Sequence, residues 1–402
     1  MTAIAADRIE SATQAYSVAA QLASEFAAGA AARDLGRELP FAEVDRLAAS
    51  GLLAITVPAA FGGADLPPSA VAEVVRVLAA ADPNIAQIPH SHFVYLNLLR
   101  LAGSGDQQLR YFGQVLAGAR IANAQSERGG ATVADIATKV RPLDNRFRID
   151  GIKFYCTGSL FADLLAVLTR LDDPEQRSGL APGEYIAYLP AATPGVRIID
   201  DWNGIGQRTT GSGTIEFENV VVERDQLIAR SAAVHAPTGY GAYAQLLHAA
   251  IDTGIARGAL TAATEFVRTS SRPWFESGVA RAVDDPLLIQ RFGELSVAVS
   301  AAEATLTAAG VAVDAAVGAA EFVASASLAV ATAKVLADRA ANEVSAALFE
   351  VGGTRSAAAD LNLHHYWRNA RTHTLHDPVR WKYQHIGRAL LHDTAPPLHG
   401  VI

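Results

Sequence analysis

The hydrophobic period of this chain changes twice, from helical to alternating near residue 121 and back to helical near residue 237. Before the first change the apolar residues have helical spacing, as in the segment 40–50, where Gly51 takes the position that ends a helix. Phe147 and Ile149 then alternate with polar residues, which is the period of a half-buried strand. The pattern therefore predicts a helical unit on either side of a β region, with boundaries at 1–118, 119–234 and 235–402.

The β region is expected to form a compact antiparallel barrel or sandwich. Between residues 214 and 222 apolar and acidic side chains alternate, and glycine and proline separate this run from its neighbours. The dipeptide Asp150-Gly151 predicts a tight hairpin turn between two strands. Further short apolar runs cover residues 164–168, 185–189 and 196–199.

A long apolar stripe in the C-terminal region predicts a helix packed against other helices. Its residues recur at alternating spacings of four and three, and the many alanines around them allow close helix approach. Such stripes on several helices usually leave surface to bury against other copies, so we expect a homo-oligomer. Charged residues interrupt the alanine-rich segment 296–322, which favours a bundle helix over a membrane span. The stripe consists of Leu288, Phe292, Leu295, Val299, Ala302, Leu306, Ala309 and Val313.

Charge and cysteine content narrow the classes of partner. The formal net charge is −8 and no run of lysine or arginine occurs, so we expect neither nucleic acid nor a membrane as partner, and a small-molecule substrate instead. A single cysteine, Cys156, excludes an internal disulfide framework and fits a reducing compartment. Asp7 and Glu10 stand where a signal peptide would be basic and then apolar, so the expected location is the cytoplasm.

The segment 367–378, WRNARTHTLHDP, carries the densest mixture of titratable groups. His373 and His376 lie three residues apart beside Asp377, and seven of the eleven histidines lie between His364 and the C-terminus. Imidazole moves protons near neutral pH, so acid–base or hydrogen-bonding use is the favoured interpretation. A metal site is the alternative, but nothing nearby resembles a complete ligand set, and we expect no metal.

Other segments are candidates, each with an ordinary structural alternative. The runs 123–130, 153–159 and 200–210 combine hydroxyl, amide or aromatic groups with glycine, which suits close approach to a planar ligand but equally an ordinary polar turn, a strand end or a loop with a buried anchor. His90 and His92 point apart on a helix, so at most one can face a site, and a structural role is the alternative. Arg272 and Arg355 could each hold a phosphate or simply form surface ion pairs.

Taken in order, the segments NAQSERGG, KFYCTG, DDWNGIGQRTTGSG, RPWFESG and WRNARTHTLHDPVRWKY resemble the acyl-CoA dehydrogenase superfamily over nearly the whole chain. Within it they are most similar to the flavin-dependent monooxygenase branch represented by dibenzothiophene monooxygenase and the sulfur-acquisition oxidoreductases. The resemblance implies an α+β fold that is mainly α, with an N-terminal helical domain, a middle β-barrel or sandwich and a C-terminal four-helix bundle. It also implies a homotetramer.

The resemblance further implies a two-component enzyme. Reduced FMN from a separate NAD(P)H-dependent flavin reductase would react with O2 through a C4a-peroxyflavin to oxygenate a small, organosulfur substrate. A dehydrogenase of the superfamily has a catalytic glutamate in a Tyr-Glu-Gly-Thr context, and the matching positions here begin with His376, Asp377 and Pro378. Arginine at residues 272 and 355, where the superfamily holds the FAD dinucleotide, favours FMN over FAD.

Site residues follow from the same matching. Asn123, Ser126, Tyr155 and Thr157 are expected to line the isoalloxazine, with Ser126 and Thr157 near its reactive edge. The resemblance places His373 and His376 against the flavin, His92 and His376 on the oxygen-reacting side, Thr157 among the catalytic residues, Trp202 and His92 near the substrate, and Arg272 and Arg355 on the phosphate or ribityl group.

Two alternatives stay open at this point. One is an FAD-dependent acyl-CoA dehydrogenase in which Asp377 is the base, and the other is a homologue of the fold that lacks oxygenase activity or binds no flavin. The sequence leaves the substrate and the outcome open, whether sulfoxidation, C–S cleavage or N-hydroxylation, because pocket shape decides both.

Overall fold

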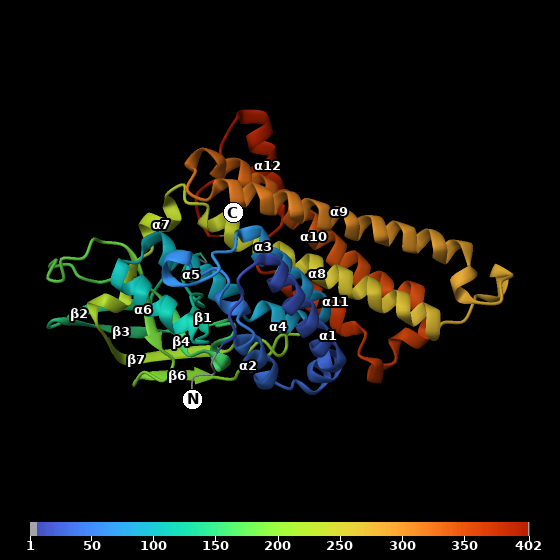
Figure 1. Ribbon diagram of the computed structural model, residues 1–402, viewed down its shortest axis with the longest axis horizontal. Helices are drawn as coiled ribbons and strands as arrows, with labels where there is room; N and C mark the ends of the chain where they lie inside the picture. The colour runs from blue at the N-terminus through green and yellow to red at the C-terminus, as the bar shows by residue number, and fades with distance from the viewer. Residues whose placement is uncertain (1–5, 133, 401) are drawn as a thin grey trace.

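A sheet lies at one end of the molecule, a bundle of long helices extends away from it, and the N-terminal helices cover the junction (Figure 1). The computed structural model describes residues 6–132, 134–400 and 402. The helical, β and helical parts follow one another along the chain as the changes of hydrophobic period predict. The expected mainly α, acyl-CoA dehydrogenase-like architecture is confirmed.

Six helices form the N-terminal part. α2 ends at Ala49, and Gly51 follows with a φ of 79°, a conformation that glycine adopts without strain, so the predicted helix stop is confirmed. At the start of α4 the Asp82 carboxylate accepts the backbone N–H groups of Asn84 and Ile85, which caps the helix. The helices are α1 (Ala12–Gly36), α2 (Phe41–Ala49), α3 (Pro68–Ala81), α4 (Pro83–Gln87), α5 (His90–Ala102) and α6 (Gly105–Leu116).

The middle part is one eight-stranded sheet with the order β6-β7-β3-β2-β4-β5-β8, and β1 also pairs with β4. Most neighbours are antiparallel as expected, but β1 and β2 both run parallel to β4, so the sheet is mixed. Parallel pairing arises because the chain crosses over between β3 and β4 instead of turning back in a hairpin. The strands are β1 (Ile121–Ala124), β2 (Lys139–Leu143), β3 (Arg146–Lys153), β4 (Leu164–Leu171), β5 (Glu184–Pro190), β6 (Val196–Ile199), β7 (Thr214–Val222) and β8 (Leu227–Ala229).

The predicted hairpin turn at Asp150-Gly151 is wrong. β3 runs through these residues, and the turn lies at residues 144–145, because Leu143 pairs with Arg146. The pairing of β3 with β7 shifts register between Ile149 and Gly151, which marks a bulge. A Cβ atom at Gly151 would lie 2.4 Å from Oγ1 of Thr138, so glycine is needed here for close approach, not for a turn.

The C-terminal part is built on three long helices. In α9 the buried residues include Leu295, Val299, Ala302, Leu306, Ala309 and Val313, which confirms the predicted stripe. α3 of the N-terminal part packs on both α8 and α9 and so takes a place in the bundle. The helices of this part are α7 (Ser231–His235), α8 (Tyr240–Thr269), α9 (Pro286–Ala316), α10 (Val323–Gly352), α11 (His364–His373) and α12 (Arg380–His392).

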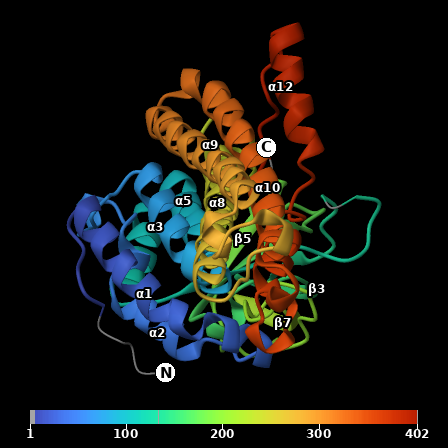
Figure 2. The ribbon, with the colours of Figure 1, turned by 90° about the vertical axis from the view of Figure 1, so that its right-hand side faces the viewer.

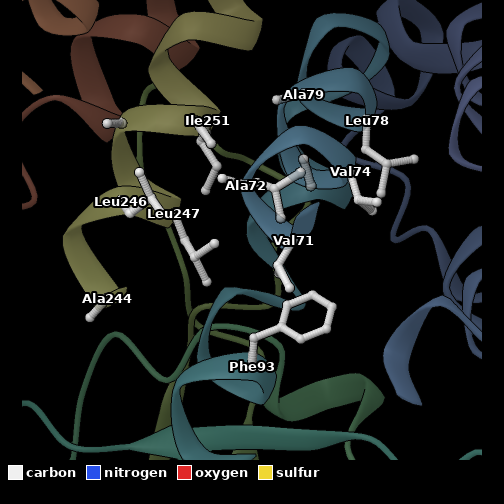
Figure 3. Packing of buried hydrophobic residues seen from close by; sticks show 14 of the residues in the cluster. Val71, Ala72, Val74, Leu78, Ala79, Phe93, Ala244, Leu246, Leu247 and Ile251 are labelled. Carbon is white, nitrogen blue, oxygen red and sulfur yellow. The ribbon is translucent and has the colours of Figure 1, made fainter. Parts of the chain in front are cut away.

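One core joins the N-terminal helices to the bundle. Side chains of α3, α5 and α8 meet in it, as Val71, Phe93 and Leu247 show in Figure 3. The inner face of the sheet has a second core. Because α5 and α8 are held rigidly together by this packing, the polar side chains at their facing ends have fixed positions.

Two helical segments, Pro286–Ala316 and Ala320–Gly352, are long and apolar enough to cross a membrane by length and composition. Buried helices of soluble proteins meet the same criterion, and here α9 and α10 pack along each other and along α8. The arrangement is that of a soluble fold. α12 packs on α10 near its beginning, and its far end extends beyond the bundle, with Leu390 and Leu391 81% and 75% exposed (Figure 2).

Candidate active site

Four imidazoles gather where α5, α8 and α11 meet. The ring of His248 stacks on that of His90 at 3.9 Å between centroids, and the ring of His376 lies 3.9 Å from His248. His373 at the end of α11 completes the group, with Nε2 3.1 Å from Nδ1 of His248. We call these four residues the histidine cluster. Two of its members come from the segment 367–378, and the fold adds the other two.

A buried acid anchors the histidine cluster. Nδ1 of His373 lies 2.5 Å from Oδ1 of Asp252, one turn beyond His248 on α8. The other carboxylate oxygen of Asp252 accepts a hydrogen bond of 2.5 Å from the ammonium of Lys334 on α10. Asp252 and Lys334 are fully buried. Burial alone would raise the pKa of Asp252, but Lys334 and His373 outweigh it and hold the pKa below its usual value.

A second carboxylate, Asp377, lies between two ammonium groups. Lys382 is 3.0 Å from Oδ2 of Asp377, and Lys334 is 4.0 Å from Oδ1. Burial acts to raise the pKa of Asp377, while Lys334 and Lys382 lower it further than burial raises it. Asp377 is therefore a charged partner of two lysines, and a carboxylate stabilised in this way is a weak base.

Three imidazoles of the histidine cluster, those of His90, His248 and His376, have lowered pKa values and are neutral near pH 7. Loss of water around the ring lowers the pKa of His90 to about 3 and that of His248 well below its ordinary value. His376 has an open edge, but the surrounding protein still lowers its pKa to about 4, against the opposing effect of Asp377. Imidazoles of the site were expected to titrate near pH 7. In the protein without a ligand, these three do not. Neutral imidazoles can still donate one hydrogen bond and accept another.

His92 lies outside the histidine cluster. Its ring is buried, Nε2 donates to the Leu53 carbonyl at 2.8 Å, and Nδ1 accepts the Ile121 N–H at 3.1 Å. Both nitrogens are thus used by the backbone, which leaves none for a peroxide or a substrate. The structure contradicts the expected catalytic and substrate-binding role of His92, and it is His90, two residues earlier, that faces the cluster.

Polar groups also lie on and after the strands of the sheet. Asn123 lies at β1, and its buried Oδ1 has no hydrogen-bond partner within the protein. Ser126 follows β1, and its backbone oxygen accepts the Phe154 N–H at 2.9 Å. Gln207 in the loop before β7 donates its N–H to Oδ1 of Asn369 at 2.7 Å, which ties this loop to α11, the helix that carries His373.

Thr157 ends a chain of three hydroxyl groups. Its Oγ1 lies 2.8 Å from Oγ of Ser212, which lies 2.6 Å from Oγ1 of Thr210. Thr210 donates its proton to the Gln207 carbonyl at 2.9 Å. Ser212 must then donate to Thr210, and Thr157 must donate to Ser212. The oxygen of Thr157 is therefore left with lone pairs only, and it can accept but not donate a further hydrogen bond.

Tyr155 and Trp202 form the wall of a cavity of about 380 Å³, which Arg128 and Ser212 also line. The two rings are 6.1 Å apart and nearly perpendicular, and the Arg128 guanidinium lies 4.9 Å from the Tyr155 ring. The Tyr155 backbone has a φ of 58°, a conformation rare for a non-glycine residue and frequent at functional sites. The cavity suits a flat ligand that contacts aromatic faces.

Arg272 and Arg355 lie at the far end of the bundle. Arg355 donates to the Ser270 carbonyl at 2.9 Å, beyond the end of α8, and Arg272 is exposed in the loop that follows. From His248 to Thr269 the helix rises by about 30 Å. One chain therefore cannot bring either arginine to a cofactor held beside its own histidine cluster.

Three site residues, His248, Asp252 and Lys334, were not predicted from the sequence, and of the pair His90 and His92 the resemblance implied His92. A signal exists in α8, where His248 and Asp252 lie four residues apart on one face among buried apolar side chains. Buried polar groups in such a helix need hydrogen-bond partners, so this spacing indicates a buried polar network. No group of metal-binding side chains was found within residues 6–132, 134–400 and 402.

Two segments of the chain match known protein families. Residues 10–119 match the family described as acyl-CoA dehydrogenase, N-terminal domain, and residues 246–381 match the corresponding C-terminal domain. Dibenzothiophene monooxygenase of Rhodococcus erythropolis is 33% identical over 94% of this chain and 93% of its own length. The chain belongs to the acyl-CoA dehydrogenase family. Within the family it lies in the monooxygenase branch, as the sequence predicts.

Two further members of the acyl-CoA dehydrogenase family bear on the site. A probable FMNH2-dependent monooxygenase of Pseudomonas putida, SfnC, is 35% identical over 95% of this chain and 96% of its own length. The structure of FMN-bound TdsC from Paenibacillus sp. A11-2 has a TM-score of 0.91 and 30% identity, covering 96% of this chain and all of the other. The TdsC structure shares the fold over its whole length, including the sheet between the two matched domains.

Proposed function

We propose that this protein is a two-component monooxygenase that uses reduced FMN and O2 to oxygenate a small organosulfur molecule. The observation that carries the proposal is the histidine cluster, which occupies the place where the family's dehydrogenases are expected to have a glutamate base. Relatives described as dibenzothiophene monooxygenase and as FMNH2-dependent support the substrate class and the cofactor. A separate NAD(P)H-dependent reductase would supply the reduced FMN, and we place both proteins in the cytoplasm.

The strand ends fit a flavin. Asn123 offers a buried oxygen without a partner, and the oxygen of Thr157 is an acceptor only. A reduced isoalloxazine carries more N–H donors than an oxidised one, so acceptors suit the reduced form. Tyr155 and Trp202 provide aromatic surface beside these groups, and we assign Ser126 to the same edge. Reduced FMN, when bound, supplies the two electrons that activate O2.

The histidine cluster supplies proton chemistry on the helical side. We assign His376 and His90 to the face that meets oxygen and substrate, because His376 has an open edge and His90 stacks directly on His248. His373 is held by Asp252 and positions His248. Neutral imidazoles can donate a hydrogen bond to a developing negative charge without bringing a permanent charge into a cavity that must exclude water.

Arg272 and Arg355 can contribute only from another copy of the chain. Since neither reaches the histidine cluster of its own chain, we assign both to the phosphate or ribityl group of FMN bound at a neighbouring subunit. The exposed apolar faces of α9 and α12 offer surface for such an assembly, which we propose is a homotetramer. The flavin site would then be complete only in the oligomer.

The rival dehydrogenase reaction is disfavoured by Asp377. Its carboxylate is paired with Lys382 and lies beside Lys334, so it is poorly suited to remove a proton from carbon. FAD released from the purified protein, together with flavin reduction by an acyl-CoA in the absence of oxygen, would establish the dehydrogenase instead.

The decisive experiment measures sulfoxide formed per O2 consumed, with reduced FMN generated chemically and dibenzothiophene as substrate. The wild type should couple oxygen consumption to product, whereas His376→Ala should still bind reduced FMN but divert oxygen mainly to hydrogen peroxide. His235→Ala, an exposed histidine on α7, is the matched control and should behave as the wild type. Methanesulfinate is a second test substrate, because the similar structure of MsuC from Pseudomonas fluorescens is that of a methanesulfinate monooxygenase. Absence of product with both compounds, despite tight FMN binding, would overturn the proposal.

A further inference from the structure

The hydrogen bonds of the histidine cluster have a direction. An ionised carboxylate only accepts hydrogen bonds, so the proton in the bond between His373 and Asp252 belongs to Nδ1 of His373. In the neutral ring Nε2 of His373 is then an acceptor. His248 lies 3.1 Å away and must donate from its own Nδ1. The bond made by one nitrogen of an imidazole thus decides the proton at the other.

Lys334 prevents Asp252 from turning. Oδ1 of Asp252 lies 2.5 Å from His373 while Oδ2 lies 2.5 Å from the Lys334 ammonium, so the two oxygens have separate partners. All three side chains are fully buried and come from α8, α10 and α11. The packing of these three helices therefore fixes the arrangement of the three side chains.

We propose that Asp252, held by Lys334, is a positioning residue that keeps His373 and His248 in their Nδ1–H tautomers. The lone pair of His248 at Nε2 is thereby a proton acceptor that this hydrogen-bond chain sets. Nε2 lies on the side of the ring away from His373, and the ring is stacked between His90 and His376. The acceptor therefore belongs to the ring that contacts both His90 and His376.

Proton uptake at this acceptor needs no further reactant. When Nε2 of His248 takes a proton, the proton on its Nδ1 can pass to Nε2 of His373. His248 is again neutral, now as the Nε2–H tautomer, and the positive charge rests on His373 beside the Asp252 carboxylate. Burial and the neighbouring groups His376, His90, His373 and Lys334 all lower the pKa of His248, which disfavours a proton held on its ring. On His373 the positive charge lies 2.5 Å from the Asp252 carboxylate.

Nitrogen-15 NMR of histidine in the cofactor-free protein at pH 7.5 tests the tautomers directly. The wild type should show Nδ1–H signatures for His373 and His248, assigned with His373→Gln and His248→Gln. In Asp252→Asn the amide oxygen must face the Lys334 ammonium, so the amide N–H2 faces His373. Both rings should then change to Nε2–H, as loss of the acid does in a Ser-His-Asp triad. Asp314→Asn, a carboxylate bonded to Ser69 on α3, is the matched control and should leave the histidine signals unchanged.

The use of this acceptor in oxygenation rests on the proposed function, so it has its own measurement. Asp252→Asn should lower sulfoxide per O2 by about 10- to 100-fold, by analogy with the loss of partners that orient a metal-bound histidine. Its affinity for reduced FMN should stay close to that of the wild type.

Nε2–H on either ring in the wild type, or unchanged tautomers in Asp252→Asn, would overturn the positioning role. Changed tautomers with unchanged coupling would overturn the acceptor role. A wild type without product would count against the proposed function alone, because the NMR result stands by itself.

Should Asp252→Asn fail to fold, Lys334→Gln provides a second test. Its amide N–H2 can still donate to Oδ2 of Asp252, so the carboxylate keeps its orientation and both Nδ1–H signatures should persist. Their loss in a folded Lys334→Gln protein would show that Asp252 alone does not set the tautomers, and would contradict the proposal.

Discussion

Lys334 and Asp252 form an ion pair of 2.5 Å in which neither side chain reaches solvent. The pair joins α10 to α8 and also fixes His373 of α11, so one buried contact supports both the bundle and the candidate active site. Burial lowers the pKa of Lys334, but the carboxylates of Asp252 and Asp377 raise it further, and the ammonium stays charged. Residues with this double role are costly to change.

Replacing Lys334 by methionine should destabilise the protein by about 3–5 kcal/mol, because Asp252 is left as a buried charge without its partner. Urea unfolding followed by circular dichroism measures the change. The double variant Lys334→Met with Asp252→Leu removes both charges and should recover part of the loss. A single variant within about 0.5 kcal/mol of the wild type would contradict a buried, charged pair.

Stability should fall as the pH is lowered from 6.5 toward 4. His90 and His92 have pKa values of about 3 and 4 in the fold against 6.5 when unfolded, so the unfolded chain binds more protons in this window. Each such histidine contributes a slope of about 1.4 kcal/mol per pH unit. Above pH 6.5 both states bind the same number of protons at these sites and the slope disappears.

The histidine contribution can be isolated with His90→Gln. Glutamine can still donate to the Ala244 carbonyl, which His90 contacts at 3.0 Å. Between pH 6.5 and 4, the slope of the free energy of unfolding against pH should be smaller in the variant by the contribution of one histidine, about 1.4 kcal/mol per pH unit. Urea unfolding at several pH values measures this slope. His235→Gln, at an exposed position, should keep the wild-type slope. Equal slopes in His90→Gln and the wild type would refute the lowered pKa.

Ser212→Ala should weaken the preference for reduced FMN. Without Ser212 the hydroxyl of Thr157 loses its acceptor and becomes free to donate, which suits an oxidised flavin nitrogen. One hydrogen bond changes affinity by about 3- to 10-fold, so the ratio of the Kd values for oxidised and reduced FMN should fall by that factor. Ser159→Ala removes a neighbouring hydroxyl that donates to the Gly211 carbonyl, and its ratio should not change.

Leu390→Asp with Leu391→Asp should shift the protein to a smaller assembly. Both side chains are more than 70% exposed at the far end of α12, which extends beyond the bundle (Figure 2). Burying two carboxylates at a contact between copies would cost more than it gains. Light scattering after gel filtration gives the mass, and Leu109→Asp on α6 is the control at another exposed leucine. An unchanged mass would exclude α12 from the assembly.

The shared flavin site can be tested by complementation. Arg272→Ala and Asn123→Ala should each bind FMN weakly as pure proteins. After mixing through reversible dissociation, some interfaces pair a wild-type arginine with a wild-type asparagine, and a fraction of the sites should bind FMN at wild-type affinity. Fluorescence titration gives the number of such sites. Recovery of none would place Arg272 outside the flavin site.

Local sequence patterns were enough to predict the order of the three parts, the stop at Gly51 and the α9 stripe from Leu295 to Val313. The similarity of five segments to the acyl-CoA dehydrogenase superfamily identified the family. The turn at Asp150-Gly151 was predicted wrongly, because a glycine needed for close approach to Thr138 looks the same in a sequence as one needed for a turn. Parallel pairing of β1 and β2 with β4 is a long-range choice that leaves no local trace.

The sequence by itself indicated a functional site near residue 373, because the histidines and their charged neighbours lie close together in one segment. Only the tertiary structure decided which imidazoles meet. His90 and His92 are two residues apart, and the angle at which α5 packs on α8 turns His90 toward His248 while the backbone takes both nitrogens of His92. Helix packing also brought Asp252 and Lys334 together from positions 82 residues apart. Such contacts depend on how whole helices dock, and that depends on the entire core.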